Sequence, residues 1–302
     1  MSILVVGSVA YDTVETPAEK RERQLGGSAS FFSLAASHFA PVRAVGVVGE
    51  DFRQADLDLL SDHDVDVSGV VRAPGRTFHW SGRYHADLIE RDTLATELGV
   101  FADFHPEIDP AWRATPYLFL ANIHPSLQLH VLAAMQAPVL TVLDTMNLWI
   151  DTTRQALLEV LARVDVLLVN DSEAAMLTGE RGMRRAAEAI QAKGPARVVV
   201  KKGEHGALFF GRDSILAVPA ILLNEVVDPT GAGDSFAGGF VGSLARAGAR
   251  NTDDDALFRR AMLYGTAVAS FCPEDFSVNG LLRIDADTLK NRLAELEAMM
   301  VS

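Results

Sequence analysis

The sequence predicts an α/β protein built on a doubly wound, mostly parallel sheet that helices flank on both sides. Short runs of branched apolar residues alternate with amphipathic stretches, at the spacing of repeated strand–helix units. The run at 164–169 is mostly apolar, as expected of a parallel strand that is covered on both faces. Two polar segments, 12–25 and 77–104, break this rhythm. Loose two-residue alternation in the second of them predicts a small antiparallel flap.

The individual elements follow from local patterns. Branched apolar runs place the strands at 3–6, 42–48, 117–121, 139–144, 164–170, 197–202 and 225–227. Helical periodicity places the helices at 28–39, 54–62, 126–135, 152–163, 183–192, 234–247, 256–271 and 286–299. The last strand is expected to stop at Asp228-Pro229, because proline cannot donate to a sheet ladder and fixes its own φ. Within the helix at 234–247, Phe236, Phe240 and Leu244 recur on one face.

Length and composition limit the class of protein. The chain has 302 residues, 49% of them hydrophobic, which suits a single domain over 1–302. A single cysteine, Cys272, excludes a disulfide framework or a thiolate metal cluster within one chain. The amino terminus has no basic signal region and no apolar stretch could span a bilayer, so we expect a cytoplasmic protein without membrane contact. The net charge of −13 argues against a nucleic-acid partner.

The most informative segment is 228–240, which reads Asp-Pro-Thr-Gly-Ala-Gly-Asp-Ser-Phe-Ala-Gly-Gly-Phe. A helix that starts just past Gly231 points unpaired N–H groups back at the glycine turn and forms an anion site. The amides of Gly231, Ala232 and Gly233 would hold the charge that grows on a transferring phosphoryl group. Asp234 would repel phosphate, so its expected role is that of a base for an attacking hydroxyl. The alternative is an ordinary glycine-rich turn that Asp234 caps.

This run resembles the second signature of the ribokinase-like (PfkB) carbohydrate kinase family. The resemblance implies a ribokinase-like fold with a small β-lid, formed by about 12–25 and 77–104, which closes over the substrate. It also implies ATP and Mg²⁺ as cofactors, with Thr230 among the residues that bind the nucleotide. Exclusion of water by such a lid is physically needed, because water would otherwise accept the phosphoryl group.

Other elements of the resemblance concern the acceptor. Asp12 follows the first strand and matches a family aspartate that binds acceptor hydroxyls, although a turn residue or cap would look the same. Gly26-Gly27 resembles the first signature, in which the glycines let the backbone approach the sugar. Phe31 stands where the family usually has an asparagine that contacts the sugar, so it is expected either to stack on the substrate or to pack in the core. Asn147 loosely matches an element near the acceptor or the phosphates.

A further set concerns the nucleotide and the metal. Asn170 and Glu173 resemble an element that holds Mg²⁺ largely through water, but their spacing is also that of a helix capping box. The turn with Lys202, Gly203 and Gly206 resembles one that runs along the nucleotide, and taken alone it is a hairpin turn. Asn279 is a candidate contact to the adenine.

These expectations converge on an ATP-dependent kinase that phosphorylates a hydroxyl of a monosaccharide. A nucleoside (adenosine-like) acceptor is the close alternative, because Phe31 replaces asparagine and the flap is rich in aromatic residues. A cyclitol is a further candidate, and a non-catalytic nucleotide- or sugar-binding regulator is the alternative from another class. Members of the family often dimerise through the lid and often use a monovalent cation such as K⁺. The sequence leaves a homodimer and K⁺ dependence open.

Overall fold

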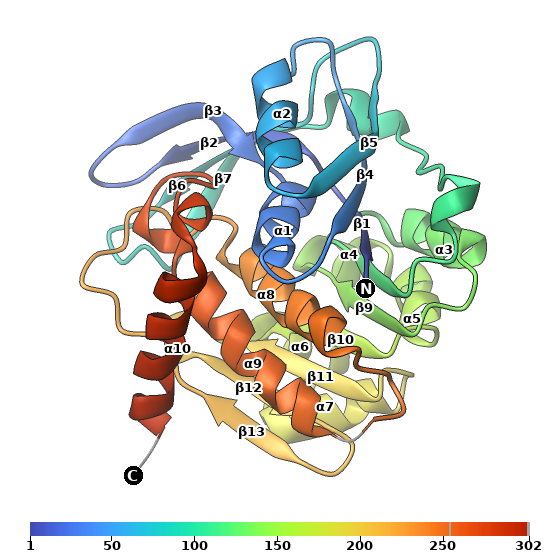
Figure 1. The fold of residues 1–302 in the computed structure, drawn as a ribbon, viewed down its shortest axis with the longest axis vertical. Coiled ribbons are helices and arrows are strands. Elements are labelled where there is room, and N and C mark those ends of the chain that lie inside the picture. Colours follow the sequence, from blue (N-terminus) through green and yellow to red (C-terminus); the bar gives the residue numbers. More distant parts are fainter. Residues whose placement is uncertain (254, 301–302) are drawn as a thin grey trace.

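A computed structural model describes residues 1–253 and 255–300 and shows a nine-stranded main sheet (Figure 1). The strand order is β13-β12-β11-β10-β9-β8-β1-β4-β5, and only β12 and β13 run antiparallel to their neighbours. The strands are β1 Ile3–Val6, β4 Val42–Val48, β5 Val65–Arg72, β8 Tyr117–Leu120, β9 Leu140–Asp144, β10 Val166–Asn170, β11 Arg197–Lys201, β12 Ala207–Phe210 and β13 Ile215–Val218. The doubly wound, mostly parallel sheet is therefore confirmed.

Helices cover both faces of this sheet, because successive side chains of each buried strand point to opposite sides. Ile3 and Val5 pack with α1, α8 and α9, whereas Leu4 and Val6 pack with α3, α5, α6 and α7 (Figure 1). The helices are α1 Ser28–Ser37, α2 Gln54–Asp62, α3 Pro125–Ala134, α4 Asn147–Thr152, α5 Arg154–Leu161, α6 Asp171–Thr178, α7 Met183–Gln191, α8 Ala232–Ala247, α9 Asp255–Ala269 and α10 Ala286–Met300. Two hydrophobic cores thus hold the sheet rigid from both sides.

Some predicted elements are wrong or incomplete. The strand expected at 225–227 does not form, because the N–H of Val227 donates to the carbonyl of Pro273 (2.7 Å) instead of to a sheet neighbour. The edge of the sheet is made by β13, which was not predicted, and β5 and β12 were also missed. The helix expected at 152–163 is shorter and is preceded by α4, because Thr153 leaves helical geometry with φ −134°.

The flap is a second, four-stranded sheet of order β3-β2-β6-β7, made by β2 Ala10–Glu15, β3 Lys20–Gly26, β6 His79–Tyr84 and β7 Arg91–Glu97. It lies beside the carboxyl ends of β1 and β5 (Figure 1). It is mixed rather than purely antiparallel, since β2 and β6 pair in parallel. The reason is topological: β2 follows β1 and β6 follows β5, so both strands leave the main sheet at its carboxyl edge. We call this sheet the lid sheet.

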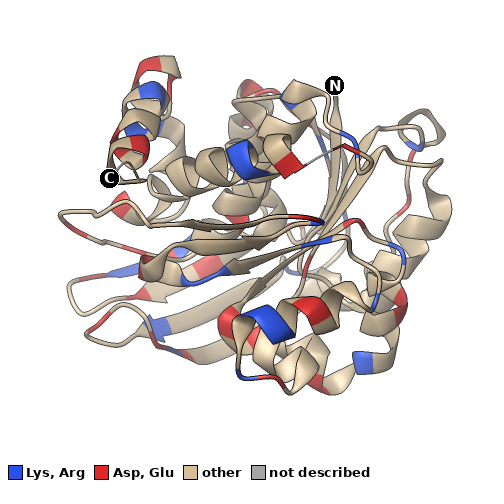
Figure 2. Ribbon diagram, turned by 90° about the horizontal axis from the view of Figure 1, so that it is seen from below, with Lys and Arg blue, Asp and Glu red and all other residues tan. Residues whose placement is uncertain are grey.

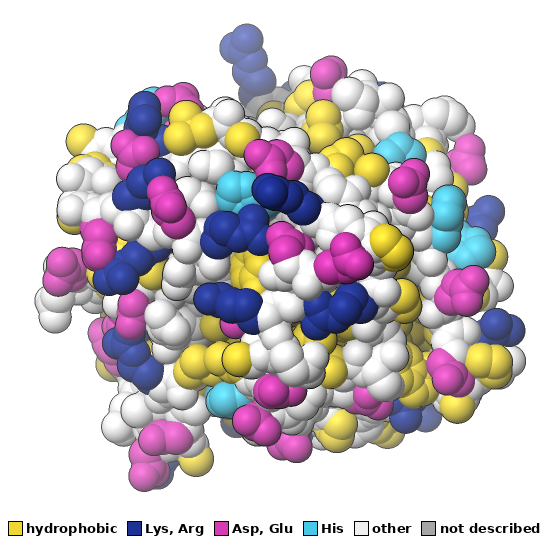
Figure 3. Space-filling view, turned by 90° about the horizontal axis from the view of Figure 1, so that it is seen from above, with side chains coloured by type: hydrophobic (Ala, Val, Ile, Leu, Met, Phe, Trp, Pro, Cys, Tyr) yellow, Lys and Arg dark blue, Asp and Glu magenta, His cyan; other side chains and the backbone are white. Residues whose placement is uncertain are grey.

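The acidic and basic residues of the chain are spread over the molecule rather than clustered in one region. Figure 2 shows acidic and basic residues interspersed along the ribbon, and Figure 3 shows both kinds side by side on the face it views. In the part of the chain that the structure describes, no helix has the length and apolar character of a membrane span. The charges that decide what this protein binds are therefore the local ones, in the cavities beneath the lid sheet.

Candidate active site

Polar side chains gather where the parallel strands of the main sheet end. Asp144 closes β9, Asn170 closes β10 and Lys201 closes β11. Asn170 and Lys201 are direct neighbours in the parallel register, and Asp144 pairs with Leu168 one strand away. In open α/β sheets ligands bind at this edge. Two cavities lie here, one on each side of the glycine turn that starts α8.

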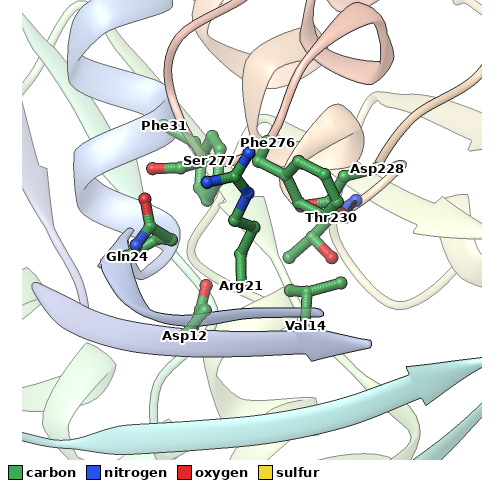
Figure 4. A pocket seen from close by; sticks show the side chains of 9 residues that line it. All are labelled: Asp12, Val14, Arg21, Gln24, Phe31, Asp228, Thr230, Phe276 and Ser277. Atoms are coloured by element: carbon green, nitrogen blue, oxygen red, sulfur yellow. Dashed lines mark hydrogen bonds between the residues drawn. The ribbon is translucent and has the colours of Figure 1, made fainter. Parts of the chain in front are cut away.

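The first cavity lies between the lid sheet and the loops around 228–230 and 276–277 (Figure 4). Its lining residues are Asp12, Val14, Arg21, Gln24, Phe31, Asp228, Thr230, Phe276 and Ser277. The Arg21 side chain reaches up between Gln24 and Phe276, and its guanidinium lies 5.6 Å from the centre of the Phe276 ring. We call this the acceptor cavity, because Asp12 and Phe31, both expected at the acceptor, meet in it.

Asp12 is buried in the wall of the acceptor cavity, with 8% of its surface exposed. A side chain at Gly26 would place its Cβ 2.0 Å from the Asp12 Oδ2, so glycine leaves the room that this carboxylate occupies. Burial raises the pKa of Asp12 to about 7, and the neighbouring Asp228 adds to the rise, while an N–H donated by Gly27 opposes it. Gly26 therefore leaves room for the Asp12 carboxylate, and Gly27 stabilises its ionised form.

Phe31 connects the acceptor cavity to the glycine turn. It lies in α1 with 2% of its surface exposed, and its ring lines the cavity. Gly231 has φ +81°, and a Cβ there would lie 2.4 Å from the ring of Phe31. The two expectations for Phe31 are thus not exclusive, because the ring is packed in the core and also forms part of the cavity wall.

The second cavity is a cleft of about 240 Å³, partly open to solvent, at the amino end of α8. It is lined by Arg91, Asn122, Asp144, Thr145, Met146, Asn147, Asn170, Ser172, Glu173, Lys201, Gly233 and Asp234. We call it the phosphate cavity. Asn147, expected near the acceptor or the phosphates, lies here and not beside Asp12, because it begins α4 beyond the carboxyl end of β9.

Asp234 stands in the first turn of α8, at the mouth of the phosphate cavity. Burial raises the pKa of Asp234 to about 7, and repulsion from Asp144 adds to the rise, whereas Lys201 and Arg91 oppose it. A carboxylate with a pKa near neutrality is suited to take a proton from a hydroxyl, because its protonation state and its proton affinity are both favourable there.

Lys201 was not predicted, since the motif pointed to its neighbour Lys202. The ammonium of Lys201 lies 2.7 Å from the Asp144 carboxylate, and a Cβ at Gly233 would be 3.3 Å from the Lys201 Nζ. Burial alone would lower the pKa of Lys201, but Asp144 and Glu173 outweigh it and raise the pKa. Successive side chains of a strand point to opposite faces, so Lys201, the last residue of β11, faces the cavity and Lys202 does not. This alternation is the signal that could have distinguished the two lysines.

The turn after β11 has the geometry of a hairpin. Gly203–His205 form a single 3-10 turn, and the Lys202 N–H donates to the Gly206 carbonyl (2.8 Å). A Cβ at Gly206 would lie 2.0 Å from the Val218 carbonyl oxygen, so this glycine supports the hairpin of β12 and β13. Lys202, Gly203, Gly206 and Asn279 are described residues, but they are not among those that line either cavity.

Asn170 and Glu173 form the capping box of α6. The Glu173 N–H donates to the Asn170 Oδ1 and the Asn170 N–H donates to the Glu173 Oε2, each at 2.8 Å. Ser172 Oγ donates to the same Asn170 oxygen at 2.7 Å. Burial raises the pKa of Glu173 to about 7. The capping interpretation is therefore confirmed, and it leaves the second oxygen of Glu173 for other partners.

This donor set fits Mg²⁺ held mainly through water. In residues 1–253 and 255–300 no three His, Cys, Asp or Glu side chains are grouped so as to enclose a metal. Mg²⁺ keeps several waters and uses few carboxylates beside substrate phosphates. Glu173 and Asp144 border the phosphate cavity and supply such carboxylates.

Residues 2–280 match the pfkB family of carbohydrate kinases, and the chain belongs to this family. Cytidine kinase of Thermococcus kodakarensis is 32% identical over 252 residues, which cover 82% of this chain and 89% of that protein. The nucleoside kinase of Methanocaldococcus jannaschii superposes with a TM-score of 0.77 at 20% identity, over 97% of this chain and 98% of that one. A putative ribokinase II from E. coli, solved with ATP and Mg²⁺, gives 0.76 at 18% identity, over 99% and 98%. The protein is thus a phosphotransferase with an alcohol group as acceptor.

The pKa of Asp234 gives a testable pH dependence. A carboxylate that takes the proton of the acceptor hydroxyl must be ionised, so with Asp234 in this expected role kcat/KM should rise with pH up to about 7 and then level off. The kcat/KM profile should be measured between pH 5.5 and 9. Asp12 is expected to contribute to its rising part as well, because the pKa of Asp12 is also about 7. The same raised pKa values mean that the folded state binds protons that the unfolded state does not, so stability is lost as pH rises through about 7. A kcat/KM profile that stays flat down to pH 5.5 would contradict the assignment of Asp234 as the base.

Proposed function

We propose that this protein transfers the γ-phosphate of ATP to a hydroxyl of a nucleoside, rather than to the free monosaccharide that the sequence alone favours. The observation that carries the proposal is the pair of aromatic rings, Phe31 and Phe276, in the wall of the acceptor cavity. A nucleobase offers a π-face to such rings, whereas a hexose offers mainly hydroxyls. The cytidine kinase that is 32% identical over most of both chains supports the same choice.

The polar lining of the acceptor cavity suits the rest of a nucleoside. Asp12 can accept two hydrogen bonds from the vicinal diol of a ribose. The Gln24 amide nitrogen already donates to the Glu22 carbonyl (2.9 Å), which leaves the amide oxygen to accept a hydrogen bond. An exocyclic amino group, as in cytosine, would provide that donor. We therefore place cytidine first among the candidate acceptors.

The two cavities divide the chemistry. Asp234 takes the proton of the attacking hydroxyl, and the amides at the start of α8, at Gly231, Ala232 and Gly233, hold the charge on the transferring group. Mg²⁺, when bound, neutralises phosphate charge. Glu173 and its capping partner Asn170 would hold its water ligands, and the turn at 202–206 would lie along the nucleotide. Thr230, expected at the nucleotide, lines the acceptor cavity and not the phosphate cavity, so we assign it to the acceptor side. Asn279 remains a proposed contact to the adenine.

A screen for ADP release tests the acceptor class. Nucleosides, free sugars and cyclitols are each supplied with ATP and Mg²⁺, and Asp234→Asn serves as the blank. We expect the highest kcat/KM with a nucleoside. A higher value for ribose or a hexose would overturn the nucleoside proposal, and a higher value for a cyclitol would do the same. Comparison of K⁺ with Na⁺ buffers, and sedimentation of the free protein, test K⁺ dependence and homodimer formation, which the sequence leaves open.

Phe31→Leu should raise the KM for a nucleoside by about tenfold, because loss of base–aromatic stacking costs about 1–3 kcal/mol. Phe32→Leu is the matched control, since Phe32 stacks on Phe119 (ring centres 4.0 Å apart) and is not among the residues lining the acceptor cavity. Both changes should lower the melting temperature, but only Phe31→Leu should change KM. Equal KM values for the two variants would show that Phe31 only packs.

A further inference from the structure

Arg91 is a basic residue of the lid sheet that reaches the phosphate cavity. It opens β7 and stands opposite Tyr84 of β6 in the antiparallel register. Although the residue as a whole is exposed, its side chain lines the cavity together with Gly233 and Asp234. Its guanidinium lies 6.0 Å from the centre of the Tyr84 ring and 5.6 Å from that of Trp80. The lid sheet thus brings a cation to the amino end of α8.

The other basic side chains near the two cavities already have carboxylate partners. Lys201 pairs with Asp144 at 2.7 Å, and Arg21 pairs with Glu19 at 2.8 Å. Within residues 1–253 and 255–300, no carboxylate lies at ion-pair distance from Arg91. Burial raises the pKa of four acidic residues in the two cavities, and the charge of Arg91 opposes part of that rise: Asp12, Glu173, Asp228 and Asp234. Among the described basic residues that line the two cavities, Arg91 is therefore the one without a carboxylate at ion-pair distance.

Arg83, on the neighbouring strand β6, shows that this placement is specific. Its Nε lies 2.8 Å from the Glu15 Oε1, and half of its side chain (51%) is exposed. It is not among the described residues that line either cavity. The two lid arginines thus differ in what they face.

The position of Arg91 depends on contact between the lid sheet and the glycine-turn segment. Tyr84 is 5% exposed, and its hydroxyl lies 3.1 Å from the Thr230 Oγ1, next to Gly231. Tyr84 also packs with Val14 and Phe276 in a small hydrophobic cluster. Because Arg91 lies over the Tyr84 ring, the contact that seats the lid sheet also places the guanidinium.

We propose that Arg91 is a catalytic residue, supplied by the lid sheet, that contacts the transferring phosphoryl group opposite the α8 amides. Phosphoryl transfer depends on positioning and on stabilising charge on the equatorial oxygens, and a planar guanidinium can bind two of them. The bond from the acceptor oxygen to phosphorus forms, the bond from phosphorus to the bridging oxygen breaks, and the proton goes to Asp234. Arg91 itself exchanges no proton. The inference rests on kinase activity and not on which acceptor is used.

The kinetic test compares Arg91→Gln with Arg83→Gln. Loss of a transition-state contact should lower kcat by about 10²–10³-fold while the acceptor KM changes little. Arg83→Gln should stay within about twofold of the unmodified enzyme, since a surface ion pair is worth little. Added guanidinium ion should restore part of the Arg91→Gln rate, which a purely structural defect would not allow. An unchanged kcat with a raised acceptor KM would overturn the proposal and make Arg91 an acceptor contact.

A binding test decides the question even if no acceptor is turned over. Calorimetry measures Mg-ADP alone and Mg-ADP with aluminium fluoride, which imitates the transferring phosphoryl group. Arg91→Gln should leave ADP affinity nearly unchanged and should remove most of the gain that aluminium fluoride provides. Retention of that gain would overturn the role of Arg91, whereas absence of turnover with every nucleoside would count only against the proposed acceptor class.

Tyr84→Phe tests the placement by the lid sheet, since it removes the hydroxyl that meets Thr230. The change should lower kcat in the unmodified enzyme and have much less effect in the Arg91→Gln background, because both act through one contact. Strictly additive effects would show that Tyr84 does not place Arg91.

Discussion

Asp234→Asn should lower kcat by about three orders of magnitude or more, because it removes the proposed general base while leaving the shape of the glycine turn. The carboxylate lines the phosphate cavity, and its pKa of about 7 suits proton transfer from an alcohol. Binding of Mg-ATP should persist, and it should tighten slightly, since a negative charge beside the phosphates is removed. Steady-state kinetics and calorimetry with ATP measure the two effects separately.

Asp287→Asn is the matched control for this change. Asp287 also lies in the first turn of a helix, α10, but it is exposed and lies outside the two cavities among the described residues. Its replacement should leave kcat unchanged and alter stability by a few tenths of a kcal/mol at most, about the size of a helix-dipole interaction. Turnover by Asp234→Asn within tenfold of the unmodified enzyme would refute the role of Asp234 as base.

Gly231→Ala should both destabilise the fold and abolish most activity. The residue has φ +81°, and a left-handed conformation costs a non-glycine residue about 1–2 kcal/mol. The added Cβ would in addition lie 2.4 Å from the Phe31 ring, so the turn or the ring must move. Movement of the turn would misplace the amides that we propose to hold the phosphoryl charge, which should lower kcat by about 10²–10³-fold. Thermal unfolding and kinetics check the two parts.

Gly179→Ala separates backbone strain from the collision. Gly179 ends α6 with a similar φ of +78°, but a Cβ there would have no described atom within 4 Å. It should lose about 1 kcal/mol of stability and keep its activity. Combining Gly231→Ala with Phe31→Leu should recover part of the lost stability, because the smaller side chain can yield. Equal stability losses in Gly231→Ala and Gly179→Ala would show that the contact with Phe31 carries no energy.

The sequence predicts the sheet and the glycine turn well because both depend on local patterns. Buried parallel strands such as β10 are apolar runs, and the turn at 231–233 is set by glycines and a helix that starts within a few residues. The strand expected at 225–227 fails for a non-local reason. Its apolar residues predict a ladder strand, but the Val227 N–H donates to the carbonyl of Pro273, in a 3-10 turn far along the chain.

The residues that sequence reasoning missed are those whose neighbours are distant in sequence. Lys201 and Lys202 are chemically alike. They differ because Lys201 is the last residue of β11 and its side chain points toward Asp144, with which it forms an ion pair. Arg83 and Arg91 likewise carry the same charge within the segment 77–104, and the sequence alone does not distinguish them. Glu15 on β2 separates them, because the parallel pairing of β2 with β6 brings Glu15 opposite Arg83. Such pairings depend on sheet topology, which no local pattern in the chain specifies.

The packing of Phe31 against Gly231 bears on how this kinase can diversify. In many enzymes the residues that choose the substrate can vary independently of those that perform the reaction. Here one ring forms the wall of the acceptor cavity and also rests on the turn that starts α8. A change that reshapes the cavity at this position therefore also removes support from the turn, so new acceptor preferences should emerge together with compensating changes near the turn.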